Sequence, residues 1–517
     1  MTVADTFQKE NVTKETMHNR RDILAIAAFL ILILVIWTGI LALPSPGLVE
    51  LSGYDGFYDF SDVNFTDTIY AYNGNWKSYP EKLYTPEDFD SGKVTEQAVL
   101  SNTLDYSRVQ YATHTMEVAL PAGQVYGLFM RTADYSMRLF VNGKEMDCVG
   151  LPGESAETTT PRVLERIYAF VPETDITSLI MQTANFVHRE GAFAPRFVIG
   201  DYLAVQRRIG KDNLIAVLVT GCLLSALLYH LSLYVLDRKR INSLLFALSC
   251  FWFAMLPKNL VMMFEGYNWQ IAFRVEYLSH YAVFTTVLLF LDNLHSGALH
   301  KTVVRGYYVF AGLFIIGLAL PTTVFTRAFI VFEVVSIAII VYVIAMLTHY
   351  SINRRKIQNF LSLAGLAVTG LFGLNDILMR FGIIFLGLIG GREFTSTIGM
   401  MFFVSCYSLV ISLEYADTER RENKLAAERM ALEVANQLKN DLMLQPKEFA
   451  LLLLLMQNEG KVMSAEELYG AAWNAPMAGD KSAVQMTVSR LRKKIEPTGY
   501  SIQSLYGKGY VFSCREE

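Results

Sequence analysis

Long apolar runs alternate with short polar connections through most of the chain. The first run occupies residues 23–43, and seven more follow a polar segment, at about 213–236, 243–265, 271–293, 303–320, 328–348, 358–379 and 395–413. A helix needs roughly 20 apolar residues to cross the hydrocarbon core of a bilayer. The pattern therefore predicts a multi-pass membrane protein with an N-terminal anchor helix (22–44) and a seven-transmembrane bundle (207–413).

Lysine and arginine gather in alternate connections between these runs. The basic positions are Arg20, Arg21, Arg238, Lys239, Arg240, Lys301, Arg305, Arg354, Arg355 and Lys356. Positively charged loops stay on the cytoplasmic side of a membrane. We therefore expect residues 1–21 to form a cytoplasmic tail, the C-terminus to be cytoplasmic and residues 45–206 to lie outside the cell. The anchor is expected to stay uncleaved, because it is long for the apolar core of a signal peptide.

The polar segment 45–206 carries short alternating runs typical of β-strands. Examples are Tyr126–Met130, Met137–Val141 and Phe197–Ile199, and the dipeptide Asn142-Gly143 after the second run is a hairpin signal. The segment is long enough for one β-sandwich, which we interpret as an extracellular sensor domain.

Composition agrees with a membrane protein, since 52% of residues are hydrophobic and 18% are charged. Of the five cysteines, Cys148 alone falls in the segment expected outside, so a disulfide within that segment is excluded. We find no CxxC pair and none of the GxxxxGK[ST], HExxH or GxSxG motifs, so the sequence indicates no catalytic residues, no metal site and no cofactor. An enzyme is not expected.

The last seventy or so residues predict three helices and a hairpin. One helix begins at Pro446 and runs through Leu455, and Ser464 with Glu467 forms a capping box for a second helix that ends near Trp473. A third helix covers Asp480–Ile495. Its apolar residues Val484, Val488, Leu491 and Ile495 share one face, which leaves Lys481, Ser482, Thr487, Arg490 and Lys494 facing outward.

Two β-rich runs complete this region, Tyr500–Leu505 and Tyr510–Ser513, with a glycine-containing turn between them. Three helices plus a hairpin make a winged helix, an α+β domain that we place at residues 443–517. An outward basic third helix suits the major groove of double-stranded DNA.

Four ordered motifs in this region resemble the OmpR-type winged-helix domain: Pro446–Phe449, Glu459–Val462, Ser489–Lys494 and Gly507–Tyr510. The chain departs from that family in having a charged helical segment where a small β-sheet usually precedes the first helix. Gln445 stands at the usual threonine cap, and Tyr506 stands where a wing-tip arginine is frequent. No part of the chain resembles the receiver domain that normally precedes such a head.

The resemblance implies DNA-contacting residues. It places Met486 and Arg490 against bases, Ser482, Thr487 and Arg492 against phosphates or groove edges, and Lys508 against the DNA backbone; Lys481 and Lys494 complete the outward set. The alternative interpretation of the basic cluster is a solvated helix end that complements the helix dipole.

Two short motifs of the outer segment, Phe140–Lys144 and Asn185–Gly191, resemble the jelly-roll extracellular domain of bacterial seven-transmembrane receptors with diverse intracellular signalling modules. The order of anchor, sandwich and seven spans is also the layout of that family. The resemblance implies a jelly-roll sensor for an unidentified extracellular ligand, either a small molecule or a carbohydrate-like compound.

Seven charged residues lie within the expected spans, in the outer third of the membrane: Lys258, Glu265, Arg274, Glu276, Glu333, Asp376 and Arg380. Charges at this depth are costly and are frequently functional. They either form a ligand or signal-relay site beneath the sandwich, or they are interfacial residues and ion pairs that hold the bundle together.

Residues 414–442 form a charged, helix-prone linker with apolar positions Leu425, Leu432, Ala435, Leu438 and Leu442. This pattern predicts either a short dimeric coiled coil, which would make the protein a homodimer, or a solvated helical linker.

The combined prediction is a one-component, membrane-embedded transcription regulator that senses an extracellular or membrane cue. The alternatives are a transporter or channel with a regulatory tail, and a receptor whose winged helix binds protein rather than DNA. The apolar runs show no internal repeat of the kind that many transporters carry.

Overall fold

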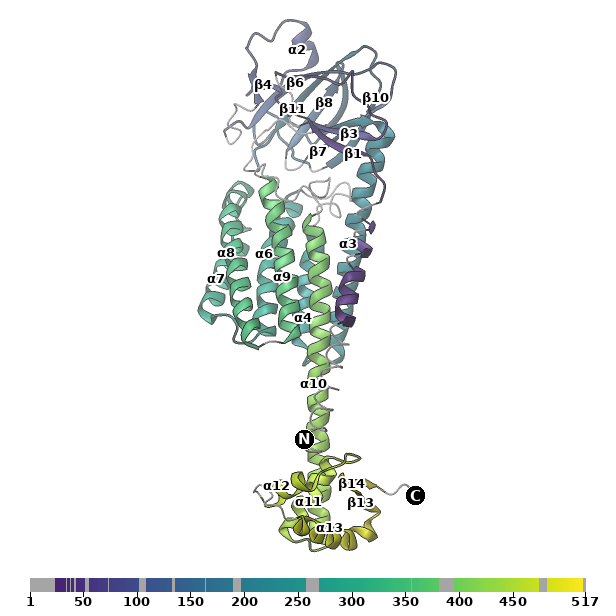
Figure 1. Ribbon diagram of the computed structural model, residues 1–517. Helices are drawn as coiled ribbons and strands as arrows, with labels where there is room; N and C mark the ends of the chain where they lie inside the picture. Colours follow the sequence, from purple (N-terminus) through teal and green to yellow (C-terminus); the bar gives the residue numbers. More distant parts are fainter. Residues whose placement is uncertain are drawn as a thin grey trace. The chain divides into compact units, whose positions relative to one another are not determined.

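The computed structural model describes residues 24–33, 35–37, 39–40, 43–51, 55–72, 74–101, 108–132, 135–162, 164–188, 197–256, 269–354, 356–380, 395–473 and 481–514. The chain divides into two compact units, one formed by residues 33–411 and the other by residues 1–32 with 412–517. The first unit contains a β-sandwich and a helical bundle (Figure 1).

Two sheets form the sandwich predicted for residues 45–206. One has the strand order β1-β3-β12-β7-β10, and the other has the order β5-β4-β6-β11-β8-β9 with β2 paired to β6. The strands are β1 Gly47–Leu51, β2 Phe57–Asp59, β3 Thr68–Tyr72, β4 Lys77–Pro80, β5 Val99–Leu100, β6 Tyr111–Ala119, β7 Tyr126–Thr132, β8 Ser136–Val141, β9 Lys144–Val149, β10 Leu164–Phe170, β11 Ile176–Ala184 and β12 Phe197–Asp201; a short helix, α2, covers Pro86–Asp90.

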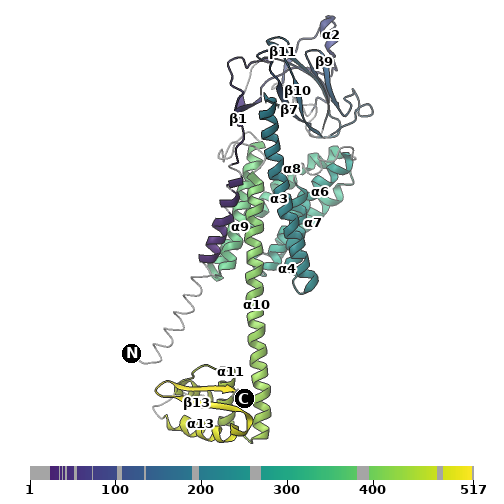
Figure 2. The ribbon, with the colours of Figure 1, turned by 90° about the vertical axis from the view of Figure 1, so that its right-hand side faces the viewer.

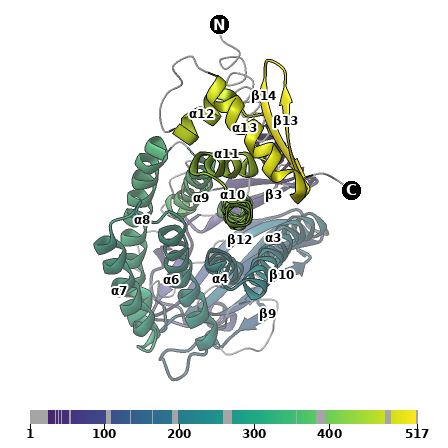
Figure 3. The ribbon, with the colours of Figure 1, turned by 90° about the horizontal axis from the view of Figure 1, so that it is seen from below.

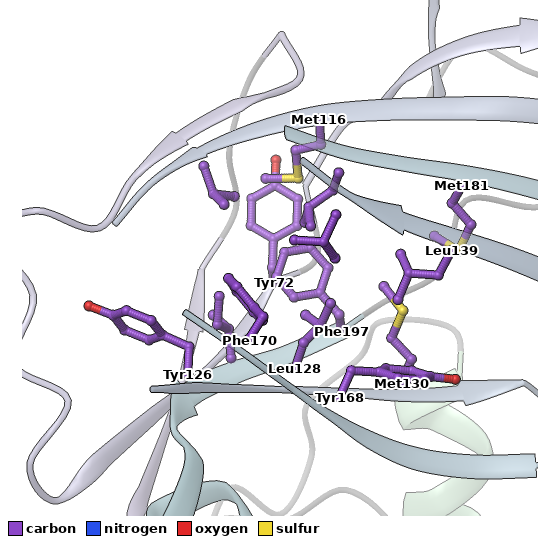
Figure 4. Close-up of a cluster of buried hydrophobic side chains, with 14 of the residues drawn as sticks. Tyr72, Met116, Tyr126, Leu128, Met130, Leu139, Tyr168, Phe170, Met181 and Phe197 are labelled. Carbon is purple, nitrogen blue, oxygen red and sulfur yellow. The ribbon is translucent and has the colours of Figure 1, made fainter. Parts of the chain in front are cut away.

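The sandwich core follows from alternation along the strands. In β6, Met116 and Val118 are buried while Glu117 between them is exposed, because successive side chains point to opposite faces. Figure 4 shows side chains from both sheets meeting in this core, among them Tyr72, Met116 and Phe197. The predicted Asn142-Gly143 turn is present between β8 and β9, and both residues have positive φ, 48° and 77°.

Helix α3, Tyr202–Leu236, begins on the sandwich and continues into the bundle. Its first turns place Ala204 and Val205 against Ile69 of the first sheet. Gly127 favours this close approach, since a Cβ there would lie 3.1 Å from the Cα of Tyr202, and α3 would have to shift by a few tenths of an ångström to admit it. Farther along α3, the ammonium of Lys211 donates to the carbonyl of Leu43, at the end of the predicted anchor, over 2.6 Å.

The bundle consists of α3 and the helices α4 Ile241–Met255, α6 Trp269–Leu294, α7 Lys301–Gly317, α8 Thr322–Arg354, α9 Ile357–Arg380 and the first part of α10, Thr395–Asp441. Seen from below in Figure 3, α4 lies between α3 and α6. Rings from different helices fill its interior, such as Phe246, Phe290 and Tyr407.

Four helices of the described residues are long and apolar enough to cross a membrane: Tyr202–Leu236, Thr322–Arg354, Ile357–Asp376 and Ile398–Asp441. Residues 24–33 and 35–37 of the expected anchor are also helical, and Ile241–Met255 is a shorter apolar helix. A membrane protein is thus supported, and the full count of spans remains a prediction.

The second unit contains the predicted winged helix, formed by α11 Pro446–Gln457, α12 Ala465–Trp473, α13 Ser482–Ile495, the short 3-10 helix η2 Glu496–Thr498, β13 Tyr500–Leu505 and β14 Gly509–Cys514. Figure 2 shows the β13–β14 hairpin beside α11 and α13. The capping box is present, because Glu467 accepts from the Ser464 N–H and Ser464 accepts from the Glu467 N–H. Sequence-based bounds of these helices were correct to within two residues.

Candidate DNA-reading surface and signal relay

Helix α13 divides into a buried face and an exposed face, as its periodicity predicts. Val484, Val488, Leu491 and Ile495 are buried in the core of the head. On the other side Lys481, Ser482, Met486 and Arg490 are exposed, and Met486 retains 55% of its accessible surface. The structure thus brings these four predicted contact residues together on an exposed surface. Thr487, the fifth, is half-buried, and its hydroxyl donates a hydrogen bond to the Ala483 carbonyl.

Arg492 lies on the side of α13 that faces the hairpin. Its Nε donates to the carbonyl of Ile502 over 2.6 Å, and its Nη2 donates to Oγ of Ser504 over 2.5 Å. Both acceptors belong to β13. The guanidinium therefore fixes the hairpin to α13, an internal role that the sequence-based assignment to phosphate contact did not include.

Lys494 also differs from its expected outward orientation. Its ammonium donates to Oε2 of Glu448 over 2.7 Å and to the carbonyl of Met443 over 3.2 Å. Glu448 is 4% exposed. Helical periodicity predicts the position of the Lys494 Cα on the outward face. It does not predict where the side chain ends, because a long side chain can bend away from the face on which its Cα lies. Its neighbour Lys493 is exposed instead and was missed.

Two opposing influences set the pKa of Glu448. Burial raises the pKa of this carboxyl, but hydrogen bonds from Lys494 and from the Gln445 N–H outweigh burial, so the pKa is lowered from its ordinary value. Glu448 thus stays ionised at neutral pH. It joins the start of α11, the end of α13 and, through Lys494, the connection that follows α10.

The hairpin is anchored at its base and exposed at its tip. Met463 and Tyr510 exchange backbone hydrogen bonds of 2.7 and 2.8 Å. Gly509 has φ +139°, and a Cβ there would lie 2.1 Å from the Met463 carbonyl oxygen, so a glycine is required. Lys508 and Tyr506 stand exposed at the tip.

The last turns of α10 belong to the hydrophobic core of the head. Leu438 is buried in that core, and Val434 and Leu442 pack against it; Ala435 is also buried. Leu425 and Leu432, by contrast, are 55% and 42% exposed. Val434, Leu438 and Leu442, which the sequence assigned to the linker 414–442, contribute to the core of the head. Ala435, Leu438 and Leu442, which were assigned to a coiled coil or a solvated linker, therefore pack within this chain.

The structure describes four of the seven predicted relay side chains. Lys258 and Glu265 lie outside the described residues, and for Arg380 the structure describes the backbone alone. Glu276, Glu333 and Asp376 are half-buried and have interaction partners.

Among the residues predicted to form a relay site, Arg274 makes contacts that connect different helices. Its Nε donates to the Leu318 carbonyl over 3.1 Å, and its guanidinium lies 5.9 Å from the centre of the Phe325 ring. These contacts join α6 to the start of the α7–α8 connection and to α8.

A contact between the sandwich and α6 was missed by the sequence reasoning. His188 follows β11, and its Nε2 lies 3.1 Å from the Tyr277 hydroxyl. The His188 ring also stacks on Phe273, with centroids 6.2 Å apart. Asn185 holds this turn, because its side-chain oxygen accepts from the N–H groups of Val187 and His188. The Asn185–Gly191 motif had marked the segment but not the partner.

Tyr277 also contacts a second helix of the bundle. Its ring packs against Phe325 and Phe329 of α8, at centroid distances of 5.2 and 4.9 Å. His188, which follows β11, and the helices α6 and α8 thus meet at the buried side chain of Tyr277.

Two family models match the chain. Residues 212–414 match the 7TM diverse intracellular signalling family, and residues 439–512 match the C-terminal domain of transcriptional regulatory proteins. The chain joins these two domain types. These matches fit the predicted fusion of a 7TM diverse intracellular signalling domain with an OmpR-type transcription-regulatory domain.

Curated relatives match the head. The transcriptional regulatory protein PhoP of Bacillus subtilis, which is named for alkaline phosphatase synthesis, is 40% identical over 74 residues, or 14% of this chain and 31% of that protein. CutR of Streptomyces coelicolor is 42% identical over 71 residues, or 14% and 32%. PhoB of Escherichia coli, a phosphate regulon regulator, is 36% identical over 72 residues, or 14% and 31%. The chain therefore spans about a third of the length of these relatives.

Solved structures give weaker likenesses. A GH2 β-galacturonidase from Eisenbergiella tayi shares 11% identity over 25% of this chain and 23% of the enzyme, with a TM-score of 0.18. A β-glucosidase from Kluyveromyces marxianus shares 11% identity over 34% and 21%, with a TM-score of 0.16. At such TM-scores these structures support no inference about this chain.

Proposed function

We propose that this protein is a one-component transcription regulator that is embedded in the membrane and binds promoter DNA through α13 and the β13–β14 hairpin. The observation that carries the proposal is the exposed face of α13, with Ser482, Met486 and Arg490 open beside a hairpin that Arg492 fixes in place. A helix presented in this way suits the major groove, and the hairpin adds a second contact.

Binding of the full-length protein in lipid nanodiscs to a random-sequence duplex pool tests this proposal. Arg490→Ala should weaken binding by about 1–3 kcal/mol and relax base preference, as expected for an arginine that reads a guanine edge. Lys447→Ala, an exposed lysine on α11, serves as the control for a general loss of positive charge. A head that binds no duplex would favour the alternative in which the winged helix binds protein.

We further propose seven spans in the bundle, one N-terminal anchor and a jelly-roll sandwich outside the cell. Alternate basic connections support this topology. Reporter fusions after Lys356 and at the C-terminus should be protected from external protease, and a fusion near Asn142 should be cleaved. Protection near Asn142 would reverse the assignment of the sandwich to the outside.

The proposed cue is an extracellular small molecule or carbohydrate-like compound, or a change in the membrane itself. Its effect would pass through α10, which runs as one helix from Thr395 to Asp441. Inserting one to four alanines after Arg421 should change basal transcription with helical phase, because each residue turns the helix by about 100°. A change in transcription that does not depend on insertion length would argue against transmission through the helix. Measurable solute flux in liposomes would instead favour the transporter alternative.

A further inference from the structure

Helix α3 connects the sandwich directly to the far end of the bundle. It begins on the first sheet, where Ala204 and Val205 pack against Ile69, and it continues without interruption to Leu236. A helix of 35 residues is about 50 Å long, because each residue adds about 1.5 Å. A displacement of the sandwich against this helix therefore reaches its last turns, where His230 lies.

The side chain of His230 is buried and contacts α10. Its Nε2 lies 3.1 Å from Oγ of Ser408, and its ring packs edge-on against Phe246 of α4, with centroids 4.7 Å apart. The Nδ1 atom of the same ring is buried and has no hydrogen-bond partner among the described residues. Such a nitrogen costs stability that an apolar ring would not cost. The imidazole is therefore poorly suited to packing alone, and its polar contact with Ser408 is what a phenyl ring could not supply.

Helix α10 also packs closely against α9. The Tyr407 hydroxyl donates to the Ser362 carbonyl over 2.8 Å. The Thr369 hydroxyl donates to the Gly399 carbonyl over 2.8 Å, and a Cβ at Gly399 would lie 3.0 Å from the Cα of Thr369. These contacts involve backbone atoms, so we expect α9 and α10 to move together. The contact with α3 joins two side chains, and it can form or break while α9 and α10 stay packed.

We propose that His230 is a positioning residue through which a displacement of α3 changes the position of α10. This inference rests on the proposed function, in which α10 carries the effect of the cue to the head. While His230 bonds Ser408, the two helices keep one register, and loss of the contact allows a second register. The net contribution of one hydrogen bond between neutral groups changes the ratio of two such arrangements about fivefold.

The junction of α3 with the sandwich provides a way to displace the helix. A Cβ at Gly127 would lie 3.1 Å from the Cα of Tyr202, so Gly127→Ala requires α3 to shift by a few tenths of an ångström. Gly200→Ala is a second variant, since its Cβ would lie 2.8 Å from a methyl group of Ile69, on which the start of α3 packs. Both variants displace the start of α3 and leave the two side chains of the proposed contact unaltered.

The test measures basal transcription by the full-length protein from a reporter whose promoter carries a duplex that the wild type selects from a random-sequence pool. Gly127→Ala should change transcription about fivefold or more, the lower end of the usual range of allosteric couplings. In a His230→Phe or Ser408→Ala background, the same change should fall below about twofold. Ser405→Ala is the matched control, because the Ser405 hydroxyl donates to the Met401 carbonyl within α10. In that background Gly127→Ala should keep its full effect.

Equal effects of Gly127→Ala with and without the His230 imidazole would overturn the proposal. So would a wild-type background in which neither Gly127→Ala nor Gly200→Ala changes transcription, because α3 would then transmit nothing. If the wild type selects no duplex, the proposed function fails before any variant is compared, and this inference fails with it.

Thermal unfolding of the purified full-length variants separates signalling from stability. His230→Phe should stay within about 3 °C of the wild type, because it removes an unpartnered nitrogen together with a hydrogen bond. A large loss of stability with an unchanged response to Gly127→Ala would assign His230 to packing and overturn the proposal. If His230→Phe does not accumulate in membranes, Ser408→Ala, which removes the hydroxyl alone, decides the outcome.

Discussion

The winged-helix head and the helical bundle both have apolar interiors, but different side-chain contacts connect their elements. In the head, charged side chains connect the elements: Lys494 bonds Glu448 between α13 and α11, and Arg492 bonds the hairpin. In the bundle, aromatic rings provide many of the contacts between helices, as in the cluster around Tyr277. The comparison shows that the charge of a residue on a helix does not reveal its role. Arg490 is exposed, whereas Arg492, two residues farther along the same helix, is bonded to the hairpin.

The largest effect should come from removing the end of α10 from the head. A fragment 443–517 lacks the core contacts of Val434, Leu438 and Leu442, whereas a fragment 430–517 retains them. Burial of a large aliphatic side chain contributes about 1.5–3 kcal/mol, so the shorter fragment should be less stable by about 4 kcal/mol or fail to fold. Urea denaturation of both fragments, followed by circular dichroism, measures the difference. Equal stability would mean that α10 is a linker up to residue 442.

The next largest loss of stability should distinguish Lys494, which contacts Glu448, from its exposed neighbour Lys493. Lys494→Met leaves the buried carboxylate of Glu448 without its main partner, which should cost about 3 kcal/mol of unfolding free energy. Lys493→Met, the matched exposed control, should change stability by less than about 0.5 kcal/mol. Urea denaturation of the 430–517 fragment measures both. Similar costs for the two substitutions would show that the Glu448 pair is not a major element of the head.

The sequence predicted more of the head than of the bundle, for a physical reason. Capping boxes, glycine turns and helix periodicity are local, so Ser464, Gly509 and the buried face of α13 could be recognised from neighbouring residues. The internal contacts of Arg492 and Lys494 could not, because they depend on where a long side chain bends. The His188–Tyr277 contact joins residues 89 positions apart. No local pattern encodes such a pairing, and the expected relay site was chosen from charge alone.

A smaller effect should reveal whether the His188–Tyr277 contact couples the sandwich to the bundle. Tyr277→Phe removes only the hydroxyl, and His188→Phe keeps a ring against Phe273. A double-mutant cycle should give a coupling energy of about 1 kcal/mol, the usual size for a hydrogen bond between neutral groups. Titration of full-length protein with a denaturing detergent measures stability, and basal transcription of the same variants measures signalling.

Additive effects of the two substitutions would mean that the hydroxyl and the imidazole act independently. In that case the relay would have to be sought among Arg274, Glu333 and the other charged residues proposed for it. Arg274→Met would then be the variant to test, because its guanidinium binds the Leu318 carbonyl and lies over Phe325.

The smallest expected effect is a change in folding stability with pH, and its direction follows from the lowered pKa of Glu448. Because the folded-state pKa of this carboxyl lies below its ordinary value of 4.5, its contribution to stability is present above that value and is lost as pH falls through the lower, folded-state pKa. The 430–517 fragment should therefore lose stability on acidification below about pH 4.5. Glu448→Gln should start less stable at pH 7 and lose less over the same interval. Parallel loss in both proteins would assign the acid sensitivity to other carboxyls. It would also weaken the contrast between a head connected by charge and a bundle connected by rings.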